Sequence, residues 1–152
     1  MIFALFNEIG IIEQLSRTLF EARLPKGVLV SHFTILNHLV RVGDGPTPLD
    51  LARAFQVPKT TLSHTLSLLD RRGWIAMRPN PDDKRSKRVW ITPEGRAFRD
   101  DAIAALGPDL DVIARDHDAD EIAALVPKLT ALRQYLDAAR DGTDPPDRSA
   151  PD

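Results

Sequence analysis

The apolar residues in the central part of the chain change their spacing at Gly73. Before this glycine they recur every three or four positions, which is the period of an amphipathic α-helix. After it they alternate with polar residues in two short runs, which is the period of a half-buried strand. Glycine suits such a junction because it readily adopts the left-handed conformation that ends a helix. The segments predicted as helices are 31–43, 47–55 and 58–72, and those predicted as strands are 74–78 and 88–91.

Helix-start signals separate the three central helices from one another. Ser31 is expected to cap the first helix. Residues 47–50 combine a threonine cap, a proline at the first helical position and an acid at the third. The third helix begins near Pro58, and its apolar stripe is Leu62, Leu66 and Leu69. The order helix, helix, turn, helix, strand, strand predicts a winged helix-turn-helix, whose hairpin tip is the polar stretch 79–87.

Longer helical patterns flank this central lobe. One spans residues 2–20, and another opens at Thr92-Pro93 and is broken at Gly107-Pro108, because proline cannot continue the hydrogen-bond ladder. A last helix starts at Asp118, and Pro127 is expected to interrupt it. The predicted fold class is mainly α with a small β-wing. The predicted division is an N-terminal helix (1–30), the winged lobe (31–97), C-terminal helices (98–140) and a disordered tail rich in proline and acid (141–152).

The charge of the chain is unevenly distributed. The net charge is only −2, but residues 57–99 hold ten basic and four acidic side chains, a local charge of +6. A basic segment in a mildly acidic protein is typical of a surface that binds phosphates, although an ordinary solvated surface stays an alternative. Glu8 and Glu13 interrupt the apolar N-terminus well before the roughly 18 residues that a membrane span needs. We therefore expect a cytoplasmic protein with no membrane contact.

The third central helix and the hairpin tip carry the candidate DNA-binding residues. With its leucines inward, the helix turns short polar side chains outward, where they can meet base edges in a major groove. The tip carries cations, and an arginine there can enter the negative minor groove. We expect Asp83 to aim the guanidinium of Arg85 through a charge-assisted bond, with a weak surface ion pair as the alternative. The predicted DNA-binding residues are Lys59, Thr60, Ser63, His64 and Ser67 on the helix, and Lys84, Arg85, Lys87 and Arg88 on the hairpin.

From residue 2 to residue 140 the sequence resembles the MarR family of regulators. The most specific marks are Asp83-Lys84-Arg85 and the run from Val89 to Gly95. The resemblance implies a homodimer formed by the first and last helices, which binds double-stranded DNA at a pseudo-palindromic operator. It also implies a repressor released by a small molecule, here expected to be aromatic or phenolic. The residues expected to line the effector pocket are His32, His38 and Trp74, although core packing is the simpler interpretation of each.

Three residues depart from this resemblance or need their own explanation. The resemblance implies that many relatives have an arginine at the position where this chain has His64, which leaves the base preference open. Val57 stands where a capping side chain is usual, so we expect a DNA phosphate to cap the following helix. Since Val89 and Ile91 face inward, Trp90 lies on the outer side of the wing. It is expected to pack on an arginine such as Arg88, with DNA or effector contact as the alternative.

Several other classes of function find no support in the sequence. There is no cysteine, and no two of the four histidines have the i, i+4 spacing of a helical metal site. No phosphate-binding glycine loop or nucleophile motif occurs, so neither a cofactor, a metal nor an enzymatic activity is expected. The alternative from a different class is a winged-helix module that binds other proteins and not DNA.

Overall fold

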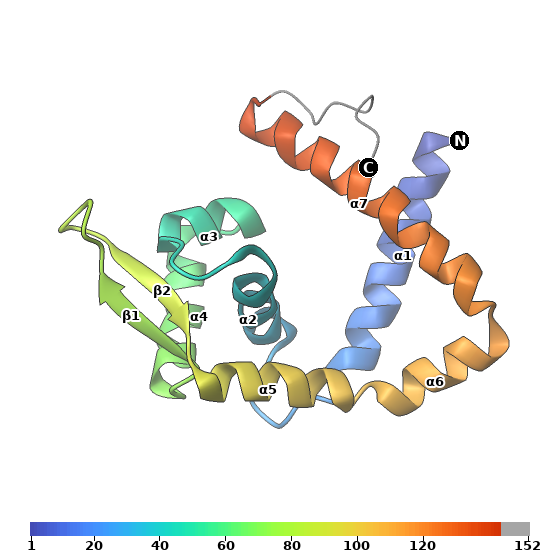
Figure 1. Cartoon of the computed structure of the whole chain (residues 1–152), viewed down its shortest axis with the longest axis horizontal. Helices are drawn as coiled ribbons and strands as arrows, with labels where there is room; N and C mark the ends of the chain where they lie inside the picture. Colours follow the sequence, from blue (N-terminus) through green and yellow to red (C-terminus); the bar gives the residue numbers. More distant parts are fainter. Residues whose placement is uncertain (144–152) are drawn as a thin grey trace. The chain divides into compact units, whose positions relative to one another are not determined.

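The computed structural model describes residues 1–143 and forms two compact units, the first of which ends at Gly107. Each unit is mainly helical, and the first also carries a two-stranded antiparallel sheet (Figure 1). The prediction of a helical protein with a small β-wing is therefore confirmed. The first unit contains α1 (Ile2–Glu21), α2 (Val30–Val42), α3 (Pro48–Phe55), α4 (Lys59–Arg71), β1 (Ile75–Pro79), β2 (Lys87–Ile91) and α5 (Pro93–Ala104). The second contains α7 (Ala119–Asp141) and, apart from its first residue, α6 (Gly107–Asp116).

The core of the first unit lies between α2, α3, α4 and the sheet. The stripe predicted for α4 is confirmed, since Leu62, Leu66 and Leu69 are at most 2% exposed. Ala52 is buried where α3 packs against this core, and Val57 packs against it from the α3–α4 connection. Because three leucines at helical spacing face inward, the opposite face of α4 is presented to solvent. The fully buried side chains are Leu36, Leu39, Leu51, Leu66, Leu69, Ile75 and Val89.

Side-chain caps start three of the helices where the sequence predicts them. The Thr47 hydroxyl accepts from the Asp50 amide at 3.2 Å, and the Asp50 carboxylate accepts from the Thr47 amide at 2.9 Å. Hydrogen bonds from Thr47 lower the pKa of the Asp50 carboxyl. The Thr92 hydroxyl accepts from the Gly95 amide at the start of α5, and the Asp118 carboxylate accepts from the Asp120 amide at the start of α7, in each case without a reciprocal bond from the third helical residue. Gly73 has the predicted left-handed conformation, with φ +71°.

The start of α2 differs from the prediction, because Ser31 is not its N-cap. The helix begins at Val30 and its N-cap is Leu29, which has no polar side chain. The ring of His32 reaches back, and its Nδ1 accepts a hydrogen bond from the Leu29 amide at 3.1 Å. The acceptor thus comes from the third helical residue and not from the residue that precedes the helix, so the usual pattern of capping residues does not predict this start.

The C-terminal helix also differs from the prediction. Pro127 lies inside α7 and does not interrupt it. The surrounding residues are exposed in the single chain, so the backbone carbonyl that loses its partner can bind water. Asp141 is still helical, and Gly142 is the left-handed C-cap with φ +67°. The predicted tail therefore starts too early, and residues 144–152 of it lie outside the described residues. The helix α5 ends at Ala104, shortly before the break predicted at Gly107-Pro108, and α6 begins at Gly107.

The turn that follows α2 is hydrogen-bonded to the edge of the hairpin formed by β2. β1 and β2 pair in antiparallel register, with Met77 opposite Val89. On the other edge of β2, the Gly45 amide donates to the Val89 carbonyl and the Val89 amide donates to the Pro46 carbonyl, both at 2.9 Å. The Ile91 amide donates to the Asp44 carboxylate at 2.7 Å. The wing is thus hydrogen-bonded to the segment that leads directly into α3.

Large apolar side chains are exposed on α1 and α7 when the chain is considered alone. Phe20, at the end of α1, is buried and meets Phe33 of α2 edge to face, with 4.3 Å between ring centroids. The earlier turns of α1 have no such cover. Among the described residues, no helix is long and apolar enough to cross a membrane. The exposed apolar residues include Ile2, Leu5, Phe6, Ile9 and Ile12 of α1, and Ile122, Leu125, Leu129 and Leu136 of α7.

Candidate nucleic-acid interface

The outer face of α4 carries the five polar residues predicted from the sequence. Lys59, Thr60, Ser63, His64 and Ser67 are all exposed. Their side chains are short, apart from the lysine and the imidazole, so a neighbouring surface can approach the helix closely. Val57 precedes α4, Pro58 is its N-cap, and no side chain caps the first turn. The open amides fit the expected phosphate cap, which stays a prediction.

Hydrogen bonds of Asp83 fold the wing tip. The Asp83 carboxylate accepts from the backbone amide of Arg85 at 2.9 Å, and its carbonyl accepts from the Ser86 amide at 3.0 Å. The predicted hydrogen bond from the Arg85 guanidinium to this carboxylate is absent from the described residues. An aspartate side chain reaches the backbone amide two residues later with little loss of conformational entropy. This local turn is therefore favoured over a bond to the long, flexible arginine side chain. Asp83 orders the tip through the backbone, and Arg85 stays exposed.

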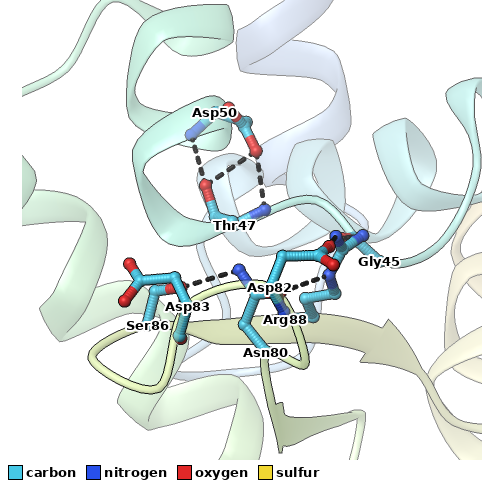
Figure 2. Close-up of polar contacts among 8 residues, drawn as sticks. All are labelled: Gly45, Thr47, Asp50, Asn80, Asp82, Asp83, Ser86 and Arg88. Atoms are coloured by element: carbon cyan, nitrogen blue, oxygen red, sulfur yellow. Dashed lines mark hydrogen bonds and ion pairs between the residues drawn. The ribbon is translucent and has the colours of Figure 1, made fainter.

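Arg88 differs from its neighbours on the hairpin because its guanidinium is engaged within the protein. It donates to the side chains of Asn80 and Asp82 and to the carbonyl of Gly45 (Figure 2). Lys84, Arg85 and Lys87 are exposed instead. Sequence reasoning grouped these four cations together and gave no role to Asn80, which is 7% exposed. An asparagine between two prolines in the tip is the only sequence signal that could have singled it out.

A cleft of about 700 Å³ lies between α4, the wing and the start of α3. Lys59, Ser63 and Ser67 line it from α4, one helical turn apart, and Arg85 and Lys87 line it from the wing. The two predicted surfaces therefore face a common space. Thr60, His64, Lys84 and Arg88 are not among its lining residues. The other lining residues are Thr47, Pro48, Leu49, Leu66, Met77, Asn80, Asp83 and Ser86.

Trp90 packs on the wing as expected, but on a different arginine. The guanidinium of Arg78, which lies on the neighbouring strand, is 5.2 Å from the indole ring centre. On the other side the indole contacts Gly45, where an added Cβ would lie 3.3 Å from the ring. Arg88, the arginine suggested by adjacency in the sequence, is turned toward the tip instead. The cross-strand diagonal brings Arg78 closer than the sequence neighbour.

The three residues suggested for an effector pocket have separate packing partners. Trp74 stacks on Phe98 with ring centroids 3.8 Å apart, and His38 meets Phe55 edge to face at 5.1 Å. His32 is buried at the start of α2. None of the three lines the cleft or a second cavity of about 280 Å³ between α1, α2, α3 and α4. The second cavity is lined by Arg17, Ser31, Thr34, Ile35, Phe55, Val57, Thr61, Leu62 and Thr65.

His32 gives the lobe a predictable pH dependence. Burial, and then the charges of Arg72 and His64, lower the pKa of His32 from its ordinary value of 6.5. The unfolded chain therefore binds this proton more readily than the folded one, so stability is lost as the pH falls below about 6.5. We expect a lower urea midpoint at pH 5 than at pH 7.5.

The matched variant for this prediction is His32→Gln, which keeps an acceptor for the Leu29 amide but does not titrate. Its urea midpoint is expected to fall less than that of the wild type over the same pH interval. Equal pH dependence in the two proteins would show that His32 is not the group responsible.

Comparison with known proteins agrees with this geometry. A model of the MarR family matches residues 26–86, from just before α2 to the wing tip. The multiple antibiotic resistance protein MarR of Escherichia coli is 31% identical over 130 residues, which cover 80% of this chain and 90% of that protein. The chain belongs to the MarR family. The multiple antibiotic resistance protein MarR of Salmonella typhimurium is 32% identical to this chain over 102 residues, which cover 66% of this chain and 70% of that protein.

Solved structures of MarR proteins have the same fold. The apo form of MarR from Escherichia coli superimposes with a TM-score of 0.70 at 28% identity, covering 84% of this chain and 96% of that one. A mutant of the same protein complexed with operator DNA gives a TM-score of 0.65 at 28% identity, covering 86% and 94%. This chain is thus a transcriptional regulator of the MarR family with a winged-helix fold. Members of this family are regulators and not enzymes.

Proposed function

We propose that this MarR-family protein is a cytoplasmic homodimer that binds double-stranded DNA at a pseudo-palindromic operator. It represses transcription there, and a small aromatic or phenolic molecule relieves the repression. The observation that carries the DNA-binding part is the cleft shared by α4 and the wing, into which Lys59, Arg85 and Lys87 all face. Two positive surfaces that converge on one space fit a polyanion better than two that diverge.

In this proposal α4 lies in the major groove and the wing tip reaches the adjacent minor groove. The short side chains of Thr60, Ser63 and Ser67 allow the helix to approach the base edges. Arg85 has no ion pair among the described residues, so its guanidinium is available for a groove of negative potential. Lys84 and Lys87 belong to the same hairpin and can neutralise phosphates, and His64 adds an imidazole that can form hydrogen bonds. Arg88 is already engaged within the wing, and we give it a different role below.

A second copy of the chain is the proposed cover for the apolar faces of α1 and α7. Rows of exposed isoleucine, leucine and phenylalanine on both helices cannot stay in water without cost. A homodimer with two-fold symmetry would bury these rows and present two copies of α4 to one face of the duplex. The operator would then consist of two inverted half-sites whose centres lie about one helical turn apart, at roughly 10 base pairs.

The proposed effector needs a site whose occupation alters the DNA-binding surface. The cavity of about 280 Å³ is a candidate, because Thr61 and Leu62 of α4 line it together with Ile35 and Phe55. Its apolar side chains suit an aromatic ring, and its hydroxyl groups suit a phenol. The neighbourhood of His32, His38 and Trp74 stays a second candidate. Binding of phenolic compounds in a thermal-shift screen, with loss of operator affinity, is the expected result.

Selection from a random duplex library tests the proposed DNA binding. The recovered sequences should share an inverted repeat, and binding should weaken steeply as salt is raised. A protein-interaction module without DNA binding would retain no sequence and would show no salt-dependent binding to any duplex. That outcome would reject the proposal in favour of the alternative.

Arg85→Ala and Lys87→Ala are expected to weaken DNA binding in different ways. Loss of Arg85 should cost about 1–3 kcal/mol on the selected operator and much less on random DNA, because a groove contact depends on sequence or groove shape. Loss of Lys87 should weaken operator and random DNA alike and reduce the salt slope by about 0.9, as for one lost phosphate contact. Fluorescence anisotropy at several salt concentrations separates the two effects. Equal losses on both kinds of DNA for Arg85→Ala would remove it from the specific contacts.

A further inference from the structure

One arginine ties the wing tip to the turn that leads into α3. The Arg88 Nε donates to the Asn80 side-chain oxygen at 3.0 Å, and one terminal nitrogen donates to the Gly45 carbonyl at 3.3 Å. The other terminal nitrogen donates to the Asp82 carboxylate at 2.6 Å (Figure 2). We propose that Arg88 is a positioning residue for DNA recognition. It holds the tip in the orientation in which Arg85 faces the cleft beside α4, and it makes no DNA contact itself.

The acceptor on the tip side is itself fixed. Asn80 is buried, its amide nitrogen donates to the Ser86 hydroxyl at 2.8 Å, and its side-chain oxygen also accepts from the Asp82 amide at 3.1 Å. The backbone amide of Asn80 donates to the Ser86 carbonyl at 3.2 Å. Both strands of the hairpin are thus joined across the base of the tip, so the guanidinium of Arg88 binds a rigid group and not a mobile loop.

The acceptor on the other side belongs to the helix-turn-helix. Gly45 is buried, has φ +93° and is held against the Trp90 indole, while its amide donates to β2. Thr47, two residues later, caps α3, and the same segment lines the cleft. A guanidinium that bridges the tip and this turn therefore couples the wing to the first helix of the motif. Without that bridge the hairpin could pivot about its own two-stranded base.

The shape of the side chain is what this role requires. A single ion pair between Arg88 and the largely exposed Asp82 would contribute little, because water screens it. Three acceptors in different directions fix one orientation of a planar guanidinium with its fork of donors. A lysine would keep the charge but could not span Asn80, Asp82 and Gly45 in the same plane. Arg88→Lys therefore keeps the positive charge that a phosphate contact would need, but it loses the hydrogen bonds that the positioning role needs.

The test rests on the proposed DNA binding and compares Arg88→Lys with Arg96→Lys, the same charge-conserving change at an exposed arginine of α5 that has no part in the proposed interface. We expect Arg88→Lys to weaken binding to the selected operator roughly tenfold, within the range for loss of one groove contact. Its affinity for random duplex should stay within twofold of wild type with the same salt slope, and Arg96→Lys should keep wild-type affinity for both kinds of DNA. The proposal would be overturned if Arg88→Lys bound the operator as tightly as wild type, or if its affinity for random duplex fell as much as its affinity for the operator.

Two further measurements isolate the mechanism. If Arg88 acts by aiming Arg85, adding Arg88→Lys to Arg85→Ala should lower the operator affinity by less than a further twofold. If the two residues acted independently, the fold-losses of the single variants would multiply. In the free protein, the backbone amides of Asn80 and Asp82 should exchange faster with solvent in Arg88→Lys, with the core amides unchanged. Unchanged exchange would refute the positioning role even if the protein bound no DNA, so the failure of this inference and that of the proposed function can be told apart.

Discussion

Ile9→Asp in α1 is expected to convert the proposed homodimer into monomers and to lower the operator affinity by at least about 100-fold. Ile9 lies in the exposed apolar row that also contains Ile2, Leu5, Phe6 and Ile12. A carboxylate buried in an apolar contact would lose its hydration without gaining a partner. Monomers could engage only one half-site each, and the gain of about 10²–10⁴ from linking two binding events would be lost. Light scattering after size exclusion and operator anisotropy measure the two effects.

Asn7→Asp is the matched control for this variant. It adds the same charge to the same stretch of α1, but on the face opposite Ile9. It should stay dimeric and bind the operator as wild type does. If Ile9→Asp were still a dimer with full operator affinity, α1 would not be part of the subunit contact.

Gly95→Ala is expected to destabilise the first unit by about 3 kcal/mol or more, beyond most overpacking changes. Gly95 lies in the first turn of α5, where an added Cβ would approach the carbonyl carbon of Trp74 to 2.8 Å and overlap its oxygen. The backbone cannot move aside easily, because the Trp74 carbonyl accepts from the Thr92 amide and the Thr92 hydroxyl donates to Gly73 at 2.6 Å. Urea unfolding followed by circular dichroism measures the loss.

Gly107→Ala provides the comparison for Gly95→Ala. An added Cβ at Gly107 would meet no atom within 4 Å. Its effect should stay within about 0.5 kcal/mol, as for most exposed substitutions. A loss at Gly95 no larger than at Gly107 would mean that α5 can shift away from the backbone of Trp74, and that the close approach is not essential to the fold.

Local signals explain why most helix starts could be predicted. Thr47, Thr92 and Asp118 each bond an amide two or three residues ahead, so the sequence alone contains both partners. The prediction for the start of α2 was wrong because the acceptor, His32, follows the N-cap and is not a usual capping residue. Pro127 was overestimated as a helix breaker, since its cost depends on whether the lost hydrogen bond can be replaced by water.

The candidate site was predicted less evenly, because parts of it depend on distant contacts. The face of α4 follows from the leucine spacing, and the tip cations are adjacent in sequence. The separate role of Arg88 depends on Gly45, which lies 43 positions earlier in the chain. The partner of the Asp83 carboxylate was predicted as a side chain and is a backbone amide. Charge patterns therefore located the surface but could not distinguish a free cation from one that is bound within the protein.

The turn between α2 and α3 also determines how copies of this protein can associate. Edge strands with free amides and carbonyls are common sites of unwanted pairing between chains. Residues 44–46 occupy the exposed edge of β2 through the bonds to Val89 and Ile91. The remaining edge belongs to β1, which is five residues long and ends at Arg78 and Pro79. Such a short edge, with a charge and a proline that has no amide hydrogen, is a poor template for sheet extension or fibre growth.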